Sequence, residues 1–199
     1  MNLTRLPRAF YERDTLVVAR ELLGKALVRR LDGRTLVGRI VETEAYKGRQ
    51  DPASHAYRGK TARNAPMFSH GGISYLFLAY GSSFCLNAST EAIGVPGAVL
   101  IRAVEPLLGI QWMRSNRTLS SDRLEHLTNG PGKLCQAMRI TGELNGIDLT
   151  QDGPLSICRL DGGSPSPFET KATSRVGLTK AYRRRWRFYI EGNKFVSRT

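Results

Sequence analysis

The strongest folding signal in this sequence is a β-hairpin over residues 27–46, LVRRLDGRTLVGRIVETEAY. Asp32-Gly33 is a dipeptide typical of two-residue hairpin turns, in which the backbone needs positive φ angles. Val, Leu, Ile and Thr fill the segments on both sides, as they do in strands. The hairpin therefore predicts that antiparallel strand pairing dominates the fold.

Three helices are predicted from the residues at their ends. Asp14 is a favoured N-cap residue, and Gly24 is a typical helix stop. Proline is favoured at the first position of a helix, which places two further helix starts at Pro106 and Pro131. The expected helices cover residues 15–23, about 107–115 and about 132–140.

The remaining segments complete a single domain over residues 1–199. Hairpins outnumber parallel crossovers in the predicted order, so we expect an α+β fold. It would be built on a curved, mostly antiparallel sheet with flanking helices and a protruding β-hairpin. Residues 47–72 show no periodicity, and so long a loop in a compact domain is usually functional. Further strands are expected at 73–80, 84–89, 98–104, 155–160 and 187–190.

Charge points to a polyanionic partner. Thirty Lys and Arg residues against seventeen Asp and Glu give a net charge of +13, and the surplus is spread over both halves of the chain. A soluble protein with such a surplus usually meets nucleic acid or an acidic membrane. The apolar runs are too short to span a bilayer, and no long basic amphipathic helix is evident. Nucleic acid is therefore favoured, and no membrane partner is expected.

A 39-residue stretch at positions 52–90 contains no Asp or Glu. Basic side chains in it precede a run of aromatic residues, a mixture that suits a nucleic-acid site because cations hold phosphates and rings stack on bases. The alternative for Tyr75 and Phe84, that they belong to the core of a sheet, stays open. Tyr80 differs because it precedes Gly81, where a ring can project from a tight turn.

A second basic run, residues 175–187, holds six Lys and Arg and no acid. Phosphate contact and a solvated charge run are equally good interpretations of each arginine in its centre. GPGKL at 130–134 opens a predicted helix and could hold a phosphate, although an ordinary helix start is the favoured interpretation. The cations that we expect at a nucleic-acid backbone are Arg58, Arg63, Lys133, Arg183, Arg184 and Arg185.

Glu42 and Glu44 are two residues apart in a predicted strand, so they share one face with Tyr46. Paired carboxylates in a positive field can supply general acid–base chemistry. The alternative is that they neutralise nearby arginines such as Arg39 or Arg102. Spacing alone leaves both interpretations open.

Cysteine and histidine give no sign of a metal centre or a disulfide framework. Each occurs three times, and neither set has the spacing of zinc ligands. We expect no metal, no cofactor and three buried free thiols, at Cys85, Cys135 and Cys158. The N-terminal MNLTRLPRAF lacks the apolar segment of a signal peptide, which predicts a cytoplasmic protein.

Six segments occur in a specific order and spacing: GRIVETEAY (38–46), SHAYRGKTARNAPMF (54–68), YLFLAYGSSFCLN (75–87), VLIRAVEP (99–106), NGPGKLCQA (129–137) and RVG (175–177). Together they resemble the alkyladenine (3-methyladenine) DNA glycosylase family, also called methylpurine glycosylases, in its bacterial form. The resemblance covers nearly the whole chain.

This resemblance implies roles at the centre of the reaction. Glu44 matches the general base that activates the attacking water, and Arg102 matches the arginine that helps to hold that water. Tyr80 matches the tyrosine that wedges into the duplex where the damaged nucleotide leaves. Ser82 and Ser83, which follow the wedge, depart from the larger residues of the family.

The resemblance also implies a base pocket. Tyr46 and His55 match walls that sandwich or hydrogen-bond the flipped base, and Asn87 matches the asparagine implicated in rejecting normal guanine. Phe77 stands where the family often has Tyr, which keeps the ring and loses the hydroxyl.

The implied reaction is base excision by a monofunctional DNA glycosylase. A purine such as 3-methyladenine, 7-methylguanine, hypoxanthine or ethenoadenine is flipped out of double-stranded DNA. Aromatic faces stack the base, and cation–π attraction would favour a positively charged one. A carboxylate stabilises charge on the sugar and deprotonates water, leaving an abasic site. No lysine lies among the pocket residues, so we expect neither a Schiff base nor strand cleavage, and we expect a monomer.

Two other functions compete with this one. A non-catalytic nucleic-acid-binding module would explain the charge and the aromatic residues but not the ETEAY motif. An enzyme with a repurposed pocket could act on another N-glycosidic or one-carbon substrate. Release of free base from damaged duplex DNA separates the three.

Overall fold

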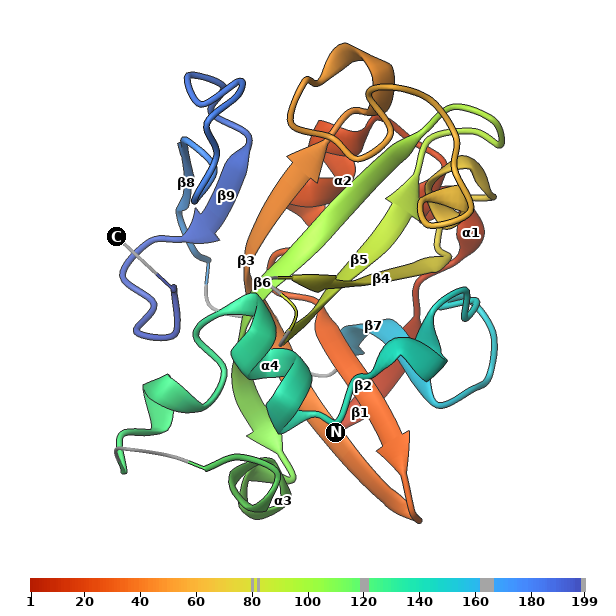
Figure 1. The fold of residues 1–199 in the computed structure, drawn as a ribbon. Helices are drawn as coiled ribbons and strands as arrows, with labels where there is room; N and C mark the ends of the chain where they lie inside the picture. The colour runs from red at the N-terminus through yellow and green to blue at the C-terminus, as the bar shows by residue number, and fades with distance from the viewer. Residues whose placement is uncertain (80, 82, 119–121, 162–166, 198–199) are drawn as a thin grey trace.

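The computed structural model describes residues 1–79, 81, 83–118, 122–161 and 167–197. Nine strands of the described residues form one sheet, and every registered strand pair is antiparallel. The sheet order is β1-β7-β2-β3-β6-β5-β4, with β9 beside β3 and β8 beside β9 (Figure 1). The strands are β1 (Asn2–Arg5), β2 (Ala26–Leu31), β3 (Arg34–Tyr46), β4 (Ser74–Ala79), β5 (Ser83–Thr90), β6 (Gly97–Leu108), β7 (Leu155–Asp161), β8 (Thr170–Thr173) and β9 (Arg187–Ile190). The expected α+β fold with a mostly antiparallel sheet is thus confirmed.

Helices are short and few beside this sheet. The described α-helices are α1 (Arg8–Tyr11), α2 (Thr15–Glu21), α3 (Ile110–Ser115) and α4 (Pro131–Ala137). The described 3-10 helices are η1 (Gly48–Gln50), η2 (Ala65–Phe68), η3 (Leu124–Leu127) and η4 (Gly142–Leu144). The Asp14 carboxylate accepts hydrogen bonds from the backbone N–H groups of Leu16 and Val17 at 2.8 and 3.3 Å, which confirms the predicted cap of α2.

The predicted hairpin forms the middle of the sheet. Asp32 and Gly33 have φ angles of 50° and 71°, as the two-residue turn requires. β3 is thirteen residues long. Its first half pairs with β2, its second half pairs with β9, and β6 follows it on the other side. Register irregularities on either side of Glu42 mark a bulge in β3, a feature that re-aims side chains next to functional sites.

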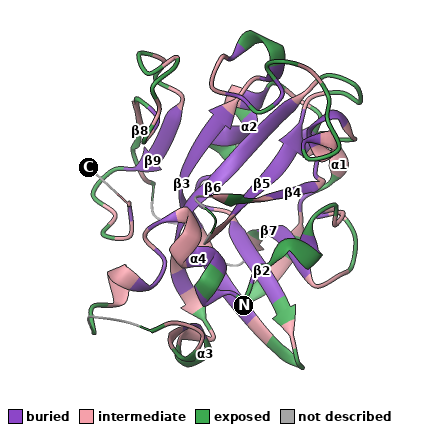
Figure 2. Ribbon diagram, in the orientation of Figure 1, coloured by how far each residue is buried: buried purple, intermediate pink, exposed green. Residues whose placement is uncertain are grey.

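The hydrophobic core lies around the central strands. β3, β5 and β6 are buried over most of their length, whereas the loops around β8 and β9 are exposed (Figure 2). α2 packs against β3 and β6, and α4 packs against β5 and β6. Fully buried side chains of both helices belong to one core cluster with the strands, among them Val18, Ala19, Leu134, Ile40 and Ile101.

The prediction that Pro106 starts a helix is wrong. Pro106 lies inside β6, opposite Gly38, at a register irregularity in β3. Among the described residues, β5 pairs with β6 only over Gly97–Leu100, so the missing N–H of Pro106 breaks no ladder on that side. α3 starts after Gly109, whose φ of 79° turns the chain out of the strand.

The predicted loop at 47–72 is present, whereas two short strands were not predicted. Residues 47–72 do form an irregular loop with only the short η1 and η2 in it. Two strands of four residues each, β1 and β8, escaped prediction. The sequence GGSPSP at 162–167 is typical of a surface loop, and residues 162–166 of it lie outside the described residues.

Gly109 provides a stability test of the turn after β6. A Cβ atom there would lie 2.4 Å from Leu36 Cδ2 and 3.2 Å from the Thr35 carbonyl oxygen. Gly109→Ala should therefore lower the free energy of unfolding by roughly 1–2 kcal/mol because alanine disfavours the left-handed conformation. Overpacking against Leu36 should add about 1–3 kcal/mol to this loss. Gly146→Ala is the matched control, because Gly146 has φ of 83° and open space around it. Equal urea midpoints for the two variants would contradict the steric role of Gly109.

Candidate active site

A cavity of about 510 Å³ opens between the ends of β3–β6, the 47–72 loop and residues 176–178. Six of the residues predicted from the sequence line it: Tyr46, His55, Arg63, Phe77, Asn87 and Arg102. The other lining residues are mostly apolar: Ala53, Met67, Tyr75, Leu78, Ala79, Cys85, Ala98, Leu100, Pro131, Val176, Gly177 and Leu178.

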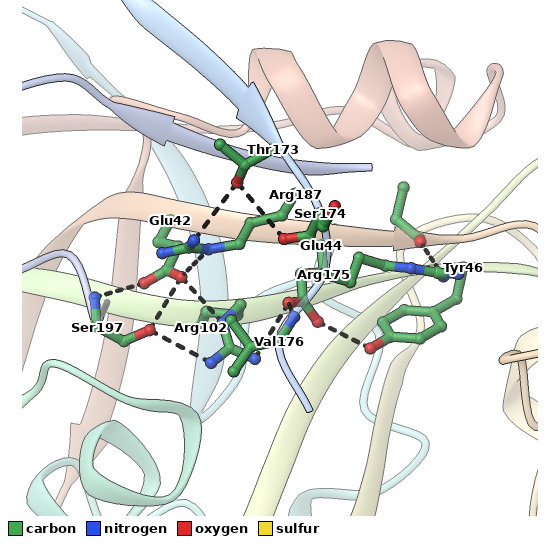
Figure 3. Close-up of polar contacts among 11 residues, drawn as sticks. Glu42, Glu44, Tyr46, Arg102, Thr173, Ser174, Arg175, Val176, Arg187 and Ser197 are labelled. Atoms are coloured by element: carbon green, nitrogen blue, oxygen red, sulfur yellow. Dashed lines mark hydrogen bonds and ion pairs between the residues drawn. The ribbon is translucent and has the colours of Figure 1, made fainter. Parts of the chain in front are cut away.

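Glu44 lies fully buried beside this cavity. Its Oε2 accepts a hydrogen bond of 2.8 Å from the Tyr46 hydroxyl, and its Oε1 accepts one of 2.7 Å from the Val176 N–H. Arg102 Nη1 lies 3.3 Å from the same Oε1 (Figure 3). Both residues that flank the carboxylate, Tyr46 and Arg102, line the cavity, so Glu44 stands at the boundary between the core and the space that a ligand would fill.

Glu42 has a different environment two residues earlier on β3. Its carboxylate accepts from Arg102 Nε at 3.0 Å, from Arg187 Nε at 2.6 Å and from the Ser197 N–H at 2.7 Å. Glu42 is fully buried and does not line the cavity. The interpretation that these acids neutralise arginines therefore describes Glu42, whereas Arg39 pairs with Glu105 instead.

These charges set the protonation of the neighbouring groups. Burial disfavours the charged form of Arg102, but the carboxylates of Glu44 and Glu42 outweigh it and raise the pKa of this guanidinium. Burial, followed by the Glu44 charge, raises the pKa of the Tyr46 hydroxyl well above its usual value. Tyr46 is thus a stable hydrogen-bond donor to Glu44 at neutral pH.

Aromatic groups form another part of the cavity wall. His55 Nδ1 lies 2.8 Å from the Tyr75 hydroxyl, and the His55 ring meets Phe77 edge-on with centroids 4.6 Å apart. Tyr75 combines both interpretations of the sequence, since it packs in a small core cluster while its ring lines the cavity. Its position two residues before Phe77 on β4 was the available signal. Phe84 packs against the main core.

Asn87 is held firmly at the same cavity. It is 3% exposed, and its Nδ2 donates to the backbone oxygen of Tyr75 at 3.0 Å and of Cys85 at 3.4 Å. Burial raises the pKa of the Cys85 thiol to about 11. Cys85, Cys135 and Cys158 are all buried and free, as predicted.

The sequence of this chain is similar to that of a known protein family. The profile of a family described as Methylpurine-DNA glycosylase (MPG) matches residues 9–194. The chain belongs to this methylpurine-DNA glycosylase family. It is therefore a DNA glycosylase, an enzyme that hydrolyses N-glycosyl compounds, and the resemblance seen in the sequence is confirmed.

Individual relatives agree over almost their full length. One from Methanoculleus marisnigri is 48% identical over 195 residues, which cover 97% of this chain and 98% of the relative. One from Chlorobium phaeobacteroides is 47% identical, with 97% and 96% covered. One from Koribacter versatilis is 43% identical, with 98% and 94% covered. Each carries the name "Putative 3-methyladenine DNA glycosylase".

Sequence reasoning missed one buried residue of the glycosylase, Arg175. Its guanidinium binds Asp51 through two contacts of 2.5 and 2.8 Å and donates to the Ala45 carbonyl oxygen at 2.8 Å. Both charged side chains are fully buried. This pair ties the segment after β8 to the end of β3, which brings the Val176 N–H onto Glu44. The only signal was the RVG triplet, since its partner lies 124 positions away.

The cations predicted at the DNA backbone differ in their exposure and in their hydrogen bonds within the protein. Arg58 and Arg183 are exposed. Arg63 is also exposed, with its guanidinium 5.6 Å from the Phe77 ring centroid. The others bind within the protein: Lys133 to Asn129, Arg184 to the Gln50 carbonyl oxygen and Arg185 to the Ala172 carbonyl oxygen. Tyr80, the predicted wedge, lies outside the described residues, as does Ser82.

The described part of the glycosylase holds no helix long and apolar enough to cross a membrane. Within the same residues, no group of three or more His, Cys, Asp and Glu side chains could hold a metal ion.

Glu42 allows a test of the buried charge cluster. Glu42→Gln removes the negative charge between Arg102 and Arg187, and breaking a buried ion pair costs about 3–5 kcal/mol of unfolding free energy. Glu105→Gln, which breaks the partly exposed pair with Arg39, should cost less than about 1 kcal/mol. Urea denaturation of both variants checks this. A smaller loss for Glu42→Gln than for Glu105→Gln would refute the structural role of Glu42.

His55 allows a test of the pocket's electrostatics. His55 is exposed at the cavity, but partial desolvation of its ring, and then the charge of Arg63, lower its pKa below the ordinary 6.5. His55 therefore binds a proton more readily in the unfolded chain than in the folded protein. Its protonation lowers the free energy of unfolding as pH falls from 6.5 towards the folded-state pKa. An NMR titration of the His55 ring should show a midpoint below 6.5, raised by Arg63→Gln. An unchanged His55 midpoint in Arg63→Gln would contradict the effect of the Arg63 charge.

Proposed function

We propose that the cavity receives a damaged purine flipped out of duplex DNA, and that Glu44 activates the water that releases it. The observation that carries this is a buried carboxylate at the edge of an aromatic-lined cavity. Its volume of about 510 Å³ falls in the usual range for small-ligand pockets. A base stacked there on Tyr46 and Phe77 would gain roughly 1–3 kcal/mol per stacking contact, which offsets the cost of flipping.

The chemistry follows from what surrounds Glu44. In the proposed step the water oxygen bonds to C1′ of the sugar while the N-glycosyl bond breaks and its electron pair leaves with the base. Glu44 takes the water proton and, while charged, stabilises the positive charge that develops on the sugar. Arg102 and the Val176 N–H hold Oε1, and the Tyr46 hydroxyl holds Oε2, so the carboxylate needs no rearrangement to act.

The substrates we propose are alkylated and deaminated purines, with 3-methyladenine first because the relatives carry its name. 7-Methylguanine, hypoxanthine and ethenoadenine complete the set. Asn87, held rigidly at the cavity, is the residue we assign to the rejection of normal guanine. The wedge function of Tyr80 and the DNA contacts of the exposed arginines stay predictions from the sequence.

The cavity also favours hydrolysis over a lyase mechanism. None of the described lining residues is a lysine, whereas a Schiff base needs an amine at the sugar. We therefore propose a monofunctional enzyme that leaves an intact strand with an abasic site. A buried acid at the cavity is also the feature that a non-catalytic binding module would not need.

Glu44→Gln tests the proposal. The amide keeps the shape and can still accept from the Val176 N–H and donate to the Tyr46 oxygen, so the variant should fold and bind DNA nearly as wild type does. Base release should fall by about 10²–10⁴-fold, the usual contribution of a general base. The measurement is single-turnover release of free base from duplex DNA containing hypoxanthine or 3-methyladenine.

Glu105→Gln is the matched control, since Glu105 pairs with Arg39 and lies outside the cavity lining; it should keep wild-type excision. Unchanged excision by Glu44→Gln would remove Glu44 from the mechanism. Tight binding by the wild type without base release would favour a binding module, and neither binding nor release would favour an enzyme for another substrate.

A further inference from the structure

A positive charge from outside the cavity lining lies against the Tyr46 ring. The Arg175 guanidinium carbon is 4.5 Å from the centroid of the Tyr46 ring, well within the range of a cation–π contact. Arg175 is fully buried and does not line the cavity, whereas Tyr46 does. The Arg175 and Tyr46 side chains lie side by side (Figure 3). Because Arg175 does not line the cavity, we infer that it covers a part of the ring that the cavity does not reach.

Arg175 cannot easily leave this position. Asp51 and the Ala45 carbonyl oxygen hold both of its terminal nitrogens. The Trp186 ring also contacts it, with a centroid 5.3 Å away, and Arg184 covers Trp186 in turn at 4.4 Å. Rings and guanidiniums thus alternate from the basic segment at the surface to the ring at the cavity.

A cation behind an aromatic ring changes what the ring's other face attracts. The ring offers one electron cloud to both faces, so a guanidinium on one face weakens the attraction for a second cation on the other. Like charges across a buried ring also repel each other directly. A neutral purine that stacks on the same face loses none of its dispersion contacts. Electron-rich rings alone would favour a positively charged alkylpurine, and Arg175 opposes that preference.

A second guanidinium, that of Arg63, acts in the same direction at the cavity. The Arg63 guanidinium lies over Phe77 at 5.6 Å, and both Arg63 and Arg102 line the cavity. Phe77, like Tyr46, therefore carries a guanidinium. Arg102 differs from Arg175 because it contacts two carboxylates, those of Glu44 and Glu42, whereas Arg175 contacts the single carboxylate of Asp51 and the Tyr46 ring. Of these groups, only Arg175 combines a ring contact with complete burial, which makes it the strongest candidate for a fixed influence on the bound base.

We propose that Arg175 is a positioning and specificity-determining residue that shifts the preference of the Tyr46 face from cationic N-alkylpurines toward neutral damaged purines. This inference rests on the proposed function of the cavity as a base pocket. It assigns Asp51 a part as well, because its carboxylate holds the guanidinium on the ring.

The test compares a cationic and a neutral substrate in one duplex sequence, carrying a single 7-methylguanine or a single hypoxanthine. Free base released in a single turnover gives a rate for each, and the ratio of the two rates is the readout. Asp51→Leu with Arg175→Met removes the buried charges together, a replacement that often preserves stability. The ratio of 7-methylguanine to hypoxanthine excision should rise about threefold to tenfold. Asp51→Asn with Arg175→Gln repeats the test in polar form, with folding of each variant checked by circular dichroism.

Two further variants separate charge from packing. Arg175→Lys keeps the positive charge beside Asp51 and should keep the wild-type ratio to within about twofold. Arg39→Gln with Glu105→Gln removes an ion pair of the same kind away from the cavity, and it should leave the ratio unchanged. A ratio that the folded double variants do not raise, or that Arg175→Lys raises equally, would overturn the inference. If wild type releases neither base, the proposed function itself fails.

Discussion

The structure depends on a buried cluster of two carboxylates and two guanidiniums at the middle of β3. Glu42 and Glu44 both contact Arg102 from the neighbouring β6, and Arg187 of β9 completes the cluster. Buried charges persist only when they are paired and hydrogen-bonded. The register of three strands is therefore bound to one set of contacts, since a shift of β3 against β6 or β9 would separate acids from arginines.

Within this cluster the two acids differ by what donates to them. Two arginines and the N–H and hydroxyl groups of Ser197 bind the Glu42 carboxylate. These contacts give Glu42 a structural role. Glu44 shares Arg102 but faces the cavity-lining Tyr46 and Val176 instead. The two acids thus share one arginine, and Glu42 holds in place the guanidinium that also contacts Glu44.

Sequence reasoning succeeded where the signal was local. Asp32-Gly33 has one favourable conformation, and a period of two then fixes which side chains of β3 share a face with Glu44. It failed at Pro106, because the tolerance of a strand for proline depends on which neighbour is missing there. It also missed the pairing of Asp51 with Arg175, since no local pattern reveals two residues that meet only in the folded chain. The family resemblance supplied the pocket residues, while the structure showed how each is held.

The donors that complete the site come from the end of the chain. The Val176 N–H reaches Glu44 across 132 positions, and the Ser197 N–H reaches Glu42 across 155. A growing chain that emerges from the ribosome carries both acids of β3 long before Arg187 and these N–H groups have been added. A molecule truncated before β8 retains most strands of the sheet and Arg102, but it lacks Arg187 and the two N–H groups that bind these carboxylates. The contacts around Glu42 and Glu44 are therefore complete only after the segment from β8 to Ser197 has joined the fold.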